Sequence, residues 1–193
     1  MAVRELSEKA QKFWNYGCRI RRHGKLPAFR DFDLMTIHDI APNMVVIDVE
    51  RPGWRLKNRF VGTTVVSLFG ETTGRYMDEI DLGEHKQKLL EIYEKAVTKA
   101  KPYWSLAQVV IVERLDGFPD RSRIFSYERL VYPLAEPDGE VKHLAAIIIR
   151  HSVEHAETGL ICRELSWPDP ASIIQPSVDR SIPVAPLDRR SRA

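Results

Sequence analysis

The chain has 193 residues, 44% of them hydrophobic, which is enough for one domain with extensions and too few for two ordinary domains. Its 29 Lys and Arg residues stand against 27 Asp and Glu residues, so the formal net charge is only +2. A charge this close to zero creates no global field toward nucleic acid or an acidic membrane, and we expect neither as a partner.

The termini and the cysteines indicate where the protein resides. The N-terminal segment is charged throughout, and the longest apolar run, Leu144 to Ile149, is far too short to span a bilayer. Cys18 and Cys162 are far apart and form no CxxC pattern, so we interpret both as ordinary thiols of a reducing compartment. We therefore expect a soluble, cytoplasmic protein.

The first predicted element is an amphipathic helix from Ser7 to about Arg22. Apolar residues recur there at helical spacing, Ser7 is a residue type favoured at the N-cap, and Gly24 marks the end. The segment that follows, Lys25 to Asn43, contains two prolines and predicts a loop with one short helical turn.

Two strands in a hairpin are predicted next, over 44–49 and 54–61, with Arg51-Pro52-Gly53 as the turn. In the second strand apolar residues alternate with charged ones, so one of its faces is apolar. We expect this face to point inward, and its residues are Trp54, Leu56 and Phe60.

The stretch from Arg59 to Ile80 is interrupted by glycines and contains no cluster of charged nucleophiles or ligands. We interpret it as one wall of a small apolar chamber. Gly62 is expected to let the chain leave the second strand at an unusual backbone angle, and Gly70 to end a short helix. Residues 85–100 then predict a helix with one apolar stripe, formed by Leu89, Tyr93, Ala96 and Val97.

Three further strands are predicted, over 106–115, 123–134 and 141–150, and the turn before the last is Asp138-Gly139. Strands grouped on both sides of the helical segment favour an α+β fold with a five-stranded antiparallel sheet over alternating βαβ units. From Trp167 onward the chain is rich in Pro, Ser, Asp and Arg, which is typical of irregular or disordered extensions.

The order of these elements is that of a PAS domain, and a series of short phrases carries a more specific resemblance. The phrases are Trp14 with Arg21-Arg22, Leu26-Pro27, Asp31-Phe32-Asp33, Pro42-Asn43, Arg59-Phe60-Val61-Gly62-Thr63, Leu68-Phe69-Gly70, Thr73-Gly74-Arg75, Glu128-Arg129-Leu130 and Tyr132-Pro133-Leu134. In this order and spacing the chain resembles the mostly alphaproteobacterial single-PAS proteins called the PAS-5 group.

The resemblance implies a PAS fold, in which helices cover one face of a five-stranded antiparallel sheet and the N-terminal amphipathic helix lies on the other. We expect an N-terminal helix and loop over 1–42, a PAS core over 43–151, and a largely irregular extension over 152–193. Three of the strands are apolar on both faces, so the second face also needs a cover. We expect the N-terminal helix to supply it, together with a second subunit in a homodimer.

The resemblance also implies a ligand cavity between the sheet and the helices. The residues that we expect to line it are Phe60, Phe69, Tyr76, Met77, His85, Leu89, Tyr93, Trp104, Tyr127 and Arg129. The alternative is that these side chains fill an ordinary core. Because PAS domains hold very different ligands or none, the resemblance assigns no cofactor.

Three kinds of site were considered besides the cavity: a zinc site, a haem site and a light-reactive cysteine. Residues 151–155, HSVEH, match the HxxEH pattern of zinc peptidases, but they follow a strand directly, and we prefer a polar strand exit. His85 lies on the helix where haem-binding PAS proteins often carry a histidine, which leaves haem as a minor hypothesis. Neither Cys18 nor Cys162 lies in the helices where light-sensing PAS relatives place their reactive cysteine. There is no nucleophile elbow or phosphate loop, so we expect no enzyme and no bound metal.

We therefore predict a stand-alone regulator in signal transduction. It binds a small apolar or amphipathic ligand, a protein partner, or both, and passes its state on through the flanking helix. The alternative is an interaction scaffold whose cavity is filled by its own side chains.

Overall fold

A computed structural model describes residues 6–22, 25–80, 86–113, 121–151 and 160–167. The strands are β1 Met44–Glu50, β2 Arg55–Val61, β3 Tyr103–Glu113, β4 Arg121–Ala135, β5 Val141–His151 and β6 Leu160–Glu164. The α-helices are α1 Glu8–Ile20, α2 Thr63–Phe69 and α3 Lys86–Thr98. Short 3₁₀ turns are η1 Phe29–Asp31, η2 Leu34–Ile37, η3 Ala41–Asn43 and η4 Met77–Glu79.

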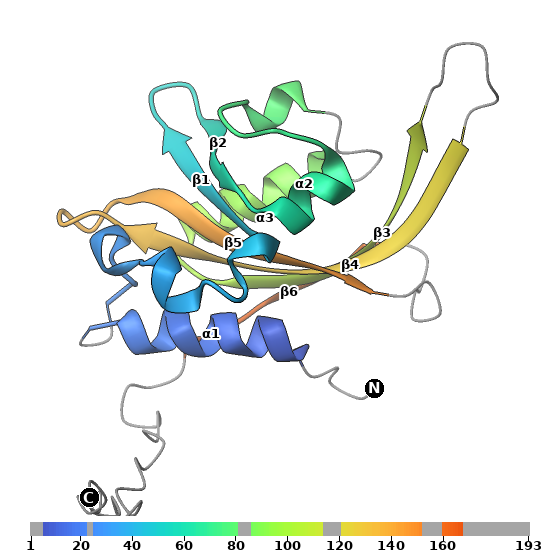
Figure 1. Cartoon of the computed structure of the whole chain (residues 1–193). Helices are drawn as coiled ribbons and strands as arrows, with labels where there is room; N and C mark the ends of the chain where they lie inside the picture. The colour runs from blue at the N-terminus through green and yellow to red at the C-terminus, as the bar shows by residue number, and fades with distance from the viewer. Residues whose placement is uncertain (1–5, 23–24, 81–85, 114–120, 152–159, 168–193) are drawn as a thin grey trace, which may run out of the picture.

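The strands form one sheet in the order β2-β1-β5-β4-β3-β6, and each neighbouring pair is antiparallel. Figure 1 shows α1 on one face of this sheet and α2 and α3 on the other. We call the face beneath α1 the outer face and the face beneath α2 and α3 the inner face. The α+β arrangement implied by the PAS resemblance is confirmed, and β6 adds a strand that the sequence analysis did not predict.

The predicted run of three consecutive antiparallel strands corresponds to β3, β4 and β5. The turn between β4 and β5 is closed by a hydrogen bond from the Gly139 N–H to the Glu136 carbonyl, with Gly139 at a φ of +86°. This left-handed conformation favours glycine. The predicted Asp138-Gly139 turn is therefore confirmed.

The new strand β6 pairs with β3 from Tyr103 to Ala107. A side-chain cluster at its end reinforces the pairing, because Glu164 accepts hydrogen bonds from Lys101, Tyr103 and Lys99 at 2.6, 2.7 and 3.1 Å. These three donors hold the pKa of the Glu164 carboxyl at about 2, below its ordinary value.

Part of the β3–β4 hairpin extends beyond the other strands. β6 accompanies β3 only as far as Ala107, and β5 accompanies β4 only from Ser126 onward. Residues 108–113 and 121–125 therefore pair only with one another among the described strands, as a two-stranded ribbon that projects from the sheet (Figure 1).

The outer face is covered by α1 and by the η1–η3 segment. Phe13 of α1 stacks on Tyr132 of β4 with ring centroids 4.4 Å apart, and both side chains are fully buried. Trp14 stacks on Trp167 at 5.0 Å, so the chain beyond β6 also contributes to the cover. The periodicity of the N-terminal sequence predicted this helix, and burial of its apolar stripe stabilises its position.

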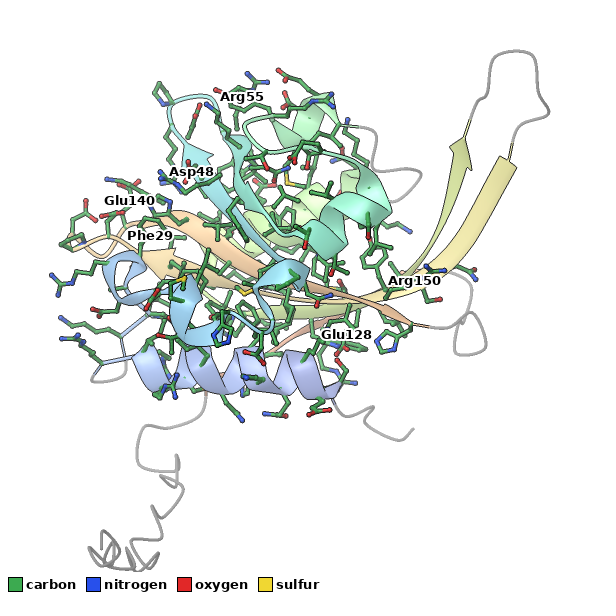
Figure 2. The ribbon with its side chains drawn as sticks, in the orientation of Figure 1. Phe29, Asp48, Arg55, Glu128, Glu140 and Arg150 are labelled. Atoms are coloured by element: carbon green, nitrogen blue, oxygen red, sulfur yellow. The ribbon has the colours of Figure 1, made fainter. Side chains whose placement is uncertain are left out.

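A buried carboxylate ties the start of α1 to the sheet. Glu128 of β4 is 2% exposed and accepts a 2.7 Å hydrogen bond from the Trp104 indole Nε1. The same side chain contacts the Ser7 backbone N–H at 3.3 Å and the His151 imidazole at 3.2 Å. Figure 2 shows Glu128 beside α1.

Glycine is needed at position 62, but not for the unusual backbone angle that was expected. Its φ of −70° and ψ of 153° are ordinary extended values that any residue adopts. Glycine is required instead because the backbone of η3 passes close by: a Cβ at Gly62 would lie 2.3 Å from the Ala41 carbonyl oxygen. The contact is between two backbone segments, so no side-chain rotation relieves it.

Gly17 gives a direct test of how α1 packs. A Cβ at this position would lie 2.8 Å from the Tyr132 ring. Gly17→Ala is therefore expected to lower the free energy of unfolding by roughly 1–3 kcal/mol through overpacking. The opposite sign, a gain of about 1 kcal/mol, is normal for this substitution in an exposed helix. Urea denaturation measures the change, Asn15→Ala on the exposed side of the helix is the control, and a stabilised Gly17→Ala variant contradicts the packing.

Removal of residues 1–24 tests the cover as a whole. The truncation is expected to expose the apolar outer face and cause aggregation, as measured by light scattering. A truncated protein that stays soluble, folded and unchanged in mass would show that α1 is dispensable. Because α1, η1–η3 and Trp167 cover this face within one chain, the homodimer stays a prediction, which the mass of the intact protein in the same experiment decides.

Candidate functional site

A small cavity lies between the inner face of the sheet and the helices α2 and α3. We call it the chamber. Its volume is about 30 Å³. The residues that line it are Val45, Asn58, Val61, Val65, Phe69, Thr72, Met77, Ile80, Leu89, Tyr93, Tyr127, Arg129 and Ile148. A space of this size holds one or two water molecules, or a solute of a few heavy atoms.

Most of the chamber wall is apolar. Val65 projects from α2, Leu89 and Tyr93 project from α3, and all three side chains are buried in the inner core. Phe69, at the end of α2, meets the Tyr127 ring edge-on at 5.7 Å. Of the α3 stripe predicted from the sequence, Leu89 and Tyr93 face the chamber, and Ala96 and Val97 are buried in the same inner core.

The loop after α2 closes one side of the chamber through Asn58 of β2. Gly70, at a φ of +83°, ends α2 as predicted and turns the chain back toward the sheet. The backbone of Asn58 then bonds this loop twice, from the Gly74 N–H at 2.7 Å and to the Arg75 carbonyl at 3.0 Å. The Asn58 side-chain amide donates to the Thr72 hydroxyl at 3.1 Å. These bonds fix Thr72 in the chamber wall.

Arg129 is the charged residue of the wall. Its side chain comes from the centre of β4 and is 3% exposed, with its guanidinium carbon 4.9 Å from the centre of the Tyr127 ring and 5.5 Å from that of Tyr93. Nε and Nη1 of Arg129 have no hydrogen-bond partner, and neither has Oδ1 of Asn58. Buried polar atoms rarely lack partners in native proteins, so we expect these atoms to bond to a water or a ligand in the chamber.

The neighbouring tyrosines modulate the charge. Burial lowers the pKa of the Arg129 guanidinium, whereas Tyr127 and Tyr93 raise it. The two tyrosines have the larger effect, so this pKa lies above its ordinary value. Burial raises the pKa of the Tyr93 phenol, which Arg129 partly counteracts. Arg129 is therefore a cation and Tyr93 a neutral phenol at neutral pH.

Six of the residues proposed from the sequence meet at the chamber, and three lie elsewhere. The six are Phe69, Met77, Leu89, Tyr93, Tyr127 and Arg129. Phe60 and Trp104 pack on the outer face, and Tyr76 lies at the surface with its hydroxyl 2.9 Å from Glu50 and its ring under Arg55. The expectation that these three line the chamber is therefore corrected.

The errors have physical causes. Phe60 follows a β-bulge in which Arg59 is the extra residue, so Phe60 and Asn58 point to opposite faces although they are two positions apart. Trp104 lies in a strand that is apolar on both faces, so alternation alone does not reveal which side is inward. Tyr76 forms an isolated bridge with Lys57, which places it over the edge strand.

The remaining sequence candidates are not among the described residues that line the chamber. His85 lies outside the described residues, and so do residues 152–155 of the HSVEH segment. Cys18 is buried in α1, where burial raises the pKa of its thiol to about 11, and Cys162 is exposed on β6. Among the described residues, no three or more His, Cys, Asp or Glu side chains are placed to hold a metal ion. None of the described helices has both the length and the apolar character needed to cross a bilayer.

Asn58 and Thr72 are chamber residues that sequence reasoning missed. Asn58 occupies an even position of β2, where the sequence pattern predicted an apolar, inward-facing residue. A polar residue at such a position was the sequence signal for a polar group in the chamber. Thr72 gave no signal, because its place depends on how the loop folds back onto β2.

Comparison with known proteins finds distant likenesses only. No family model matches the chain, and no curated protein matches it significantly. The light-oxygen-voltage domain of a flavin-analogue study is 18% identical over 63% of this chain and 86% of its own length, with a TM-score of 0.43. The Rhodobacter sphaeroides light-oxygen-voltage protein is 10% identical over 64% of this chain and 71% of its own length, with a TM-score of 0.39. At these values the matches assign no family, ligand or partner to the chain.

Thr72→Val tests the closure of the chamber. The substitution keeps the shape of the side chain but removes the hydroxyl that accepts from the buried Asn58 amide, which then keeps only the longer 3.4 Å bond to the Thr72 carbonyl. We therefore expect a loss of about 1 kcal/mol in the free energy of unfolding. Thr73→Val, at the adjacent exposed position, is the control: it removes an exposed hydroxyl bonded to Glu71 and is expected to change stability by less than about 0.5 kcal/mol. Equal effects of the two variants in urea denaturation would argue against the Asn58–Thr72 bond as a closure.

Proposed function

We propose that the chain is a PAS-type sensory or interaction module of the PAS-5 group, which binds a small apolar or amphipathic ligand, a protein partner, or both. The observation that carries the proposal is the chamber, in which apolar walls surround a few polar atoms that have no partner. Apolar pockets with a small number of convergent polar groups are the usual form of a ligand site.

The structure supports a route from the chamber to the flanking helix. Arg129 faces the chamber on the inner face of β4, and its neighbour Glu128 faces the outer face. Glu128 contacts the Ser7 N–H at the start of α1. A ligand that moves Arg129 therefore acts on a backbone segment that also holds α1, and α1 is the element that we propose to pass the state to a partner.

The described residues do not fit a flavin or a haem. One of the similar structures comes from a study with a flavin analogue, and the haem hypothesis rests on His85. A cavity of about 30 Å³ is about ten times smaller than ordinary sites for ligands of drug size. The described chamber wall also contains no cysteine and no histidine. Haem at His85 stays a minor hypothesis, which an absorption spectrum of the purified protein decides.

The second candidate is an interaction scaffold with a filled chamber. The small volume favours it, since the inner-face side chains already occupy most of the space between the sheet and α3. In this alternative the protein works by docking alone, and the unpartnered atoms at Arg129 bind only water.

Native mass spectrometry of freshly purified protein separates the two candidates. Under the sensor hypothesis a fraction of the protein retains an extra mass, and denaturation releases it because the folded chamber is the binding site. A denatured sample of the same preparation is the control for covalent modification. A protein that carries no extra mass after purification from cells, and gains none from a metabolite extract, supports the scaffold.

A further inference from the structure

Two nitrogens of the buried Arg129 cation, Nε and Nη1, lack a hydrogen-bond partner, and they specify the class of ligand. Resting on the proposed ligand-binding function, we propose that the chamber binds a short-chain organic carboxylate, with Arg129 as its counter-ion and the apolar walls around its hydrocarbon part.

The first argument is the burial of an unpaired charge. Arg129 keeps its charge at any physiological pH and is 3% exposed. A charge removed from water is costly unless an opposite charge or hydrogen-bond acceptors replace its hydration. The rings of Tyr127 and Tyr93 replace part of it through cation–π contacts, but Nε and Nη1 still have no acceptor. An anion in the chamber would supply the hydrogen-bond acceptors and the negative charge that the tyrosine rings do not provide.

The second argument is the absence of a carboxylate in the described wall. The residues that line the chamber within the described ranges include no Asp and no Glu. Glu128 is adjacent in the chain, but alternation along β4 points it to the outer face, where Trp104 and His151 bind it. Charge balance at Arg129 thus has to come from a bound anion or from a part of the chain outside the described residues.

The third argument is the size and polarity of the space. A cavity of about 30 Å³ admits a few heavy atoms, which excludes nucleotides and long acyl chains. Val65, Leu89 and Ile148 provide apolar contact beside the charged group. A carboxylate with a short hydrocarbon part matches both surfaces, because its oxygens accept charge-assisted hydrogen bonds and its carbon atoms stay out of water.

Nuclear magnetic resonance tests the inference on the intact protein. The probe is sodium propionate, and sodium chloride at equal ionic strength is the control. The Arg129 Nε–H signal, assigned by its loss in Arg129→Met, is expected to shift in a saturable way with propionate and to stay in place with chloride. An Nε–H signal that does not move at saturating propionate overturns the inference.

Variants show whether the effect belongs to Arg129. Propionate is expected to raise the unfolding temperature of the wild type and of Arg163→Met, which removes an exposed arginine from β6 of the same sheet. In Arg129→Met the propionate affinity is expected to fall roughly tenfold or more, because the charge-assisted hydrogen bonds are lost. Equal thermal shifts in wild type and Arg129→Met mean a general salt effect and overturn the inference.

Asp81 and Glu84 are acidic residues outside the described part of the chain. They are varied to test whether the chain itself supplies the counter-ion of Arg129. A response to propionate that appears only in Asp81→Asn or Glu84→Gln shows that the chain supplies its own counter-ion, which also overturns the inference. The proposed function has a separate outcome: a retained neutral ligand in native mass spectrometry, without any propionate response, preserves the sensor and removes only the carboxylate.

Discussion

The central strands β1, β5 and β4 carry apolar side chains on both faces, and the hydrophobic effect therefore requires a cover on each side of the sheet. The inner face has α2, α3 and the described residues 70–80 that follow α2. The outer face has α1 and the η1–η3 segment, with Trp167 stacked on Trp14. This two-sided burial explains why an N-terminal helix and Trp167, beyond β6, both pack on central strands that lie far from them in sequence.

Strand β4 carries two charged residues within this otherwise apolar core. Glu128 and Arg129 are consecutive, buried and of opposite charge, yet they do not meet, because alternation sends one to each face. Glu128 is satisfied by groups of the outer face, whereas Arg129 keeps unpartnered nitrogens in the chamber. Buried polar atoms without partners are rare in native proteins, which is why the Arg129 nitrogens are the atoms that we expect a molecule in the chamber to contact.

The sequence predicted those features that local pattern determines. The periodicity of α1 and α3, the hairpin of β1 and β2, and the Asp138-Gly139 turn all follow from residue types at short spacing. Features set by long-range pairing were missed or misplaced. The bulge at Arg59 reverses the side on which Phe60 lies, the inward side of β3 at Trp104 depends on its neighbours, and β6 needs the free edge of β3.

The ribbon of residues 108–113 and 121–125 has a consequence for the exchange of amide protons with solvent. Within it, each strand is hydrogen-bonded to its partner along one edge, and along the other edge no described strand accompanies it. Amides directed toward the partner strand are protected only as long as the two strands stay together, and two strands without a third are marginally stable. Protection should therefore fall sharply along β3 beyond Ala107, while the amides of the same strand beside β6 exchange only with the opening of the sheet.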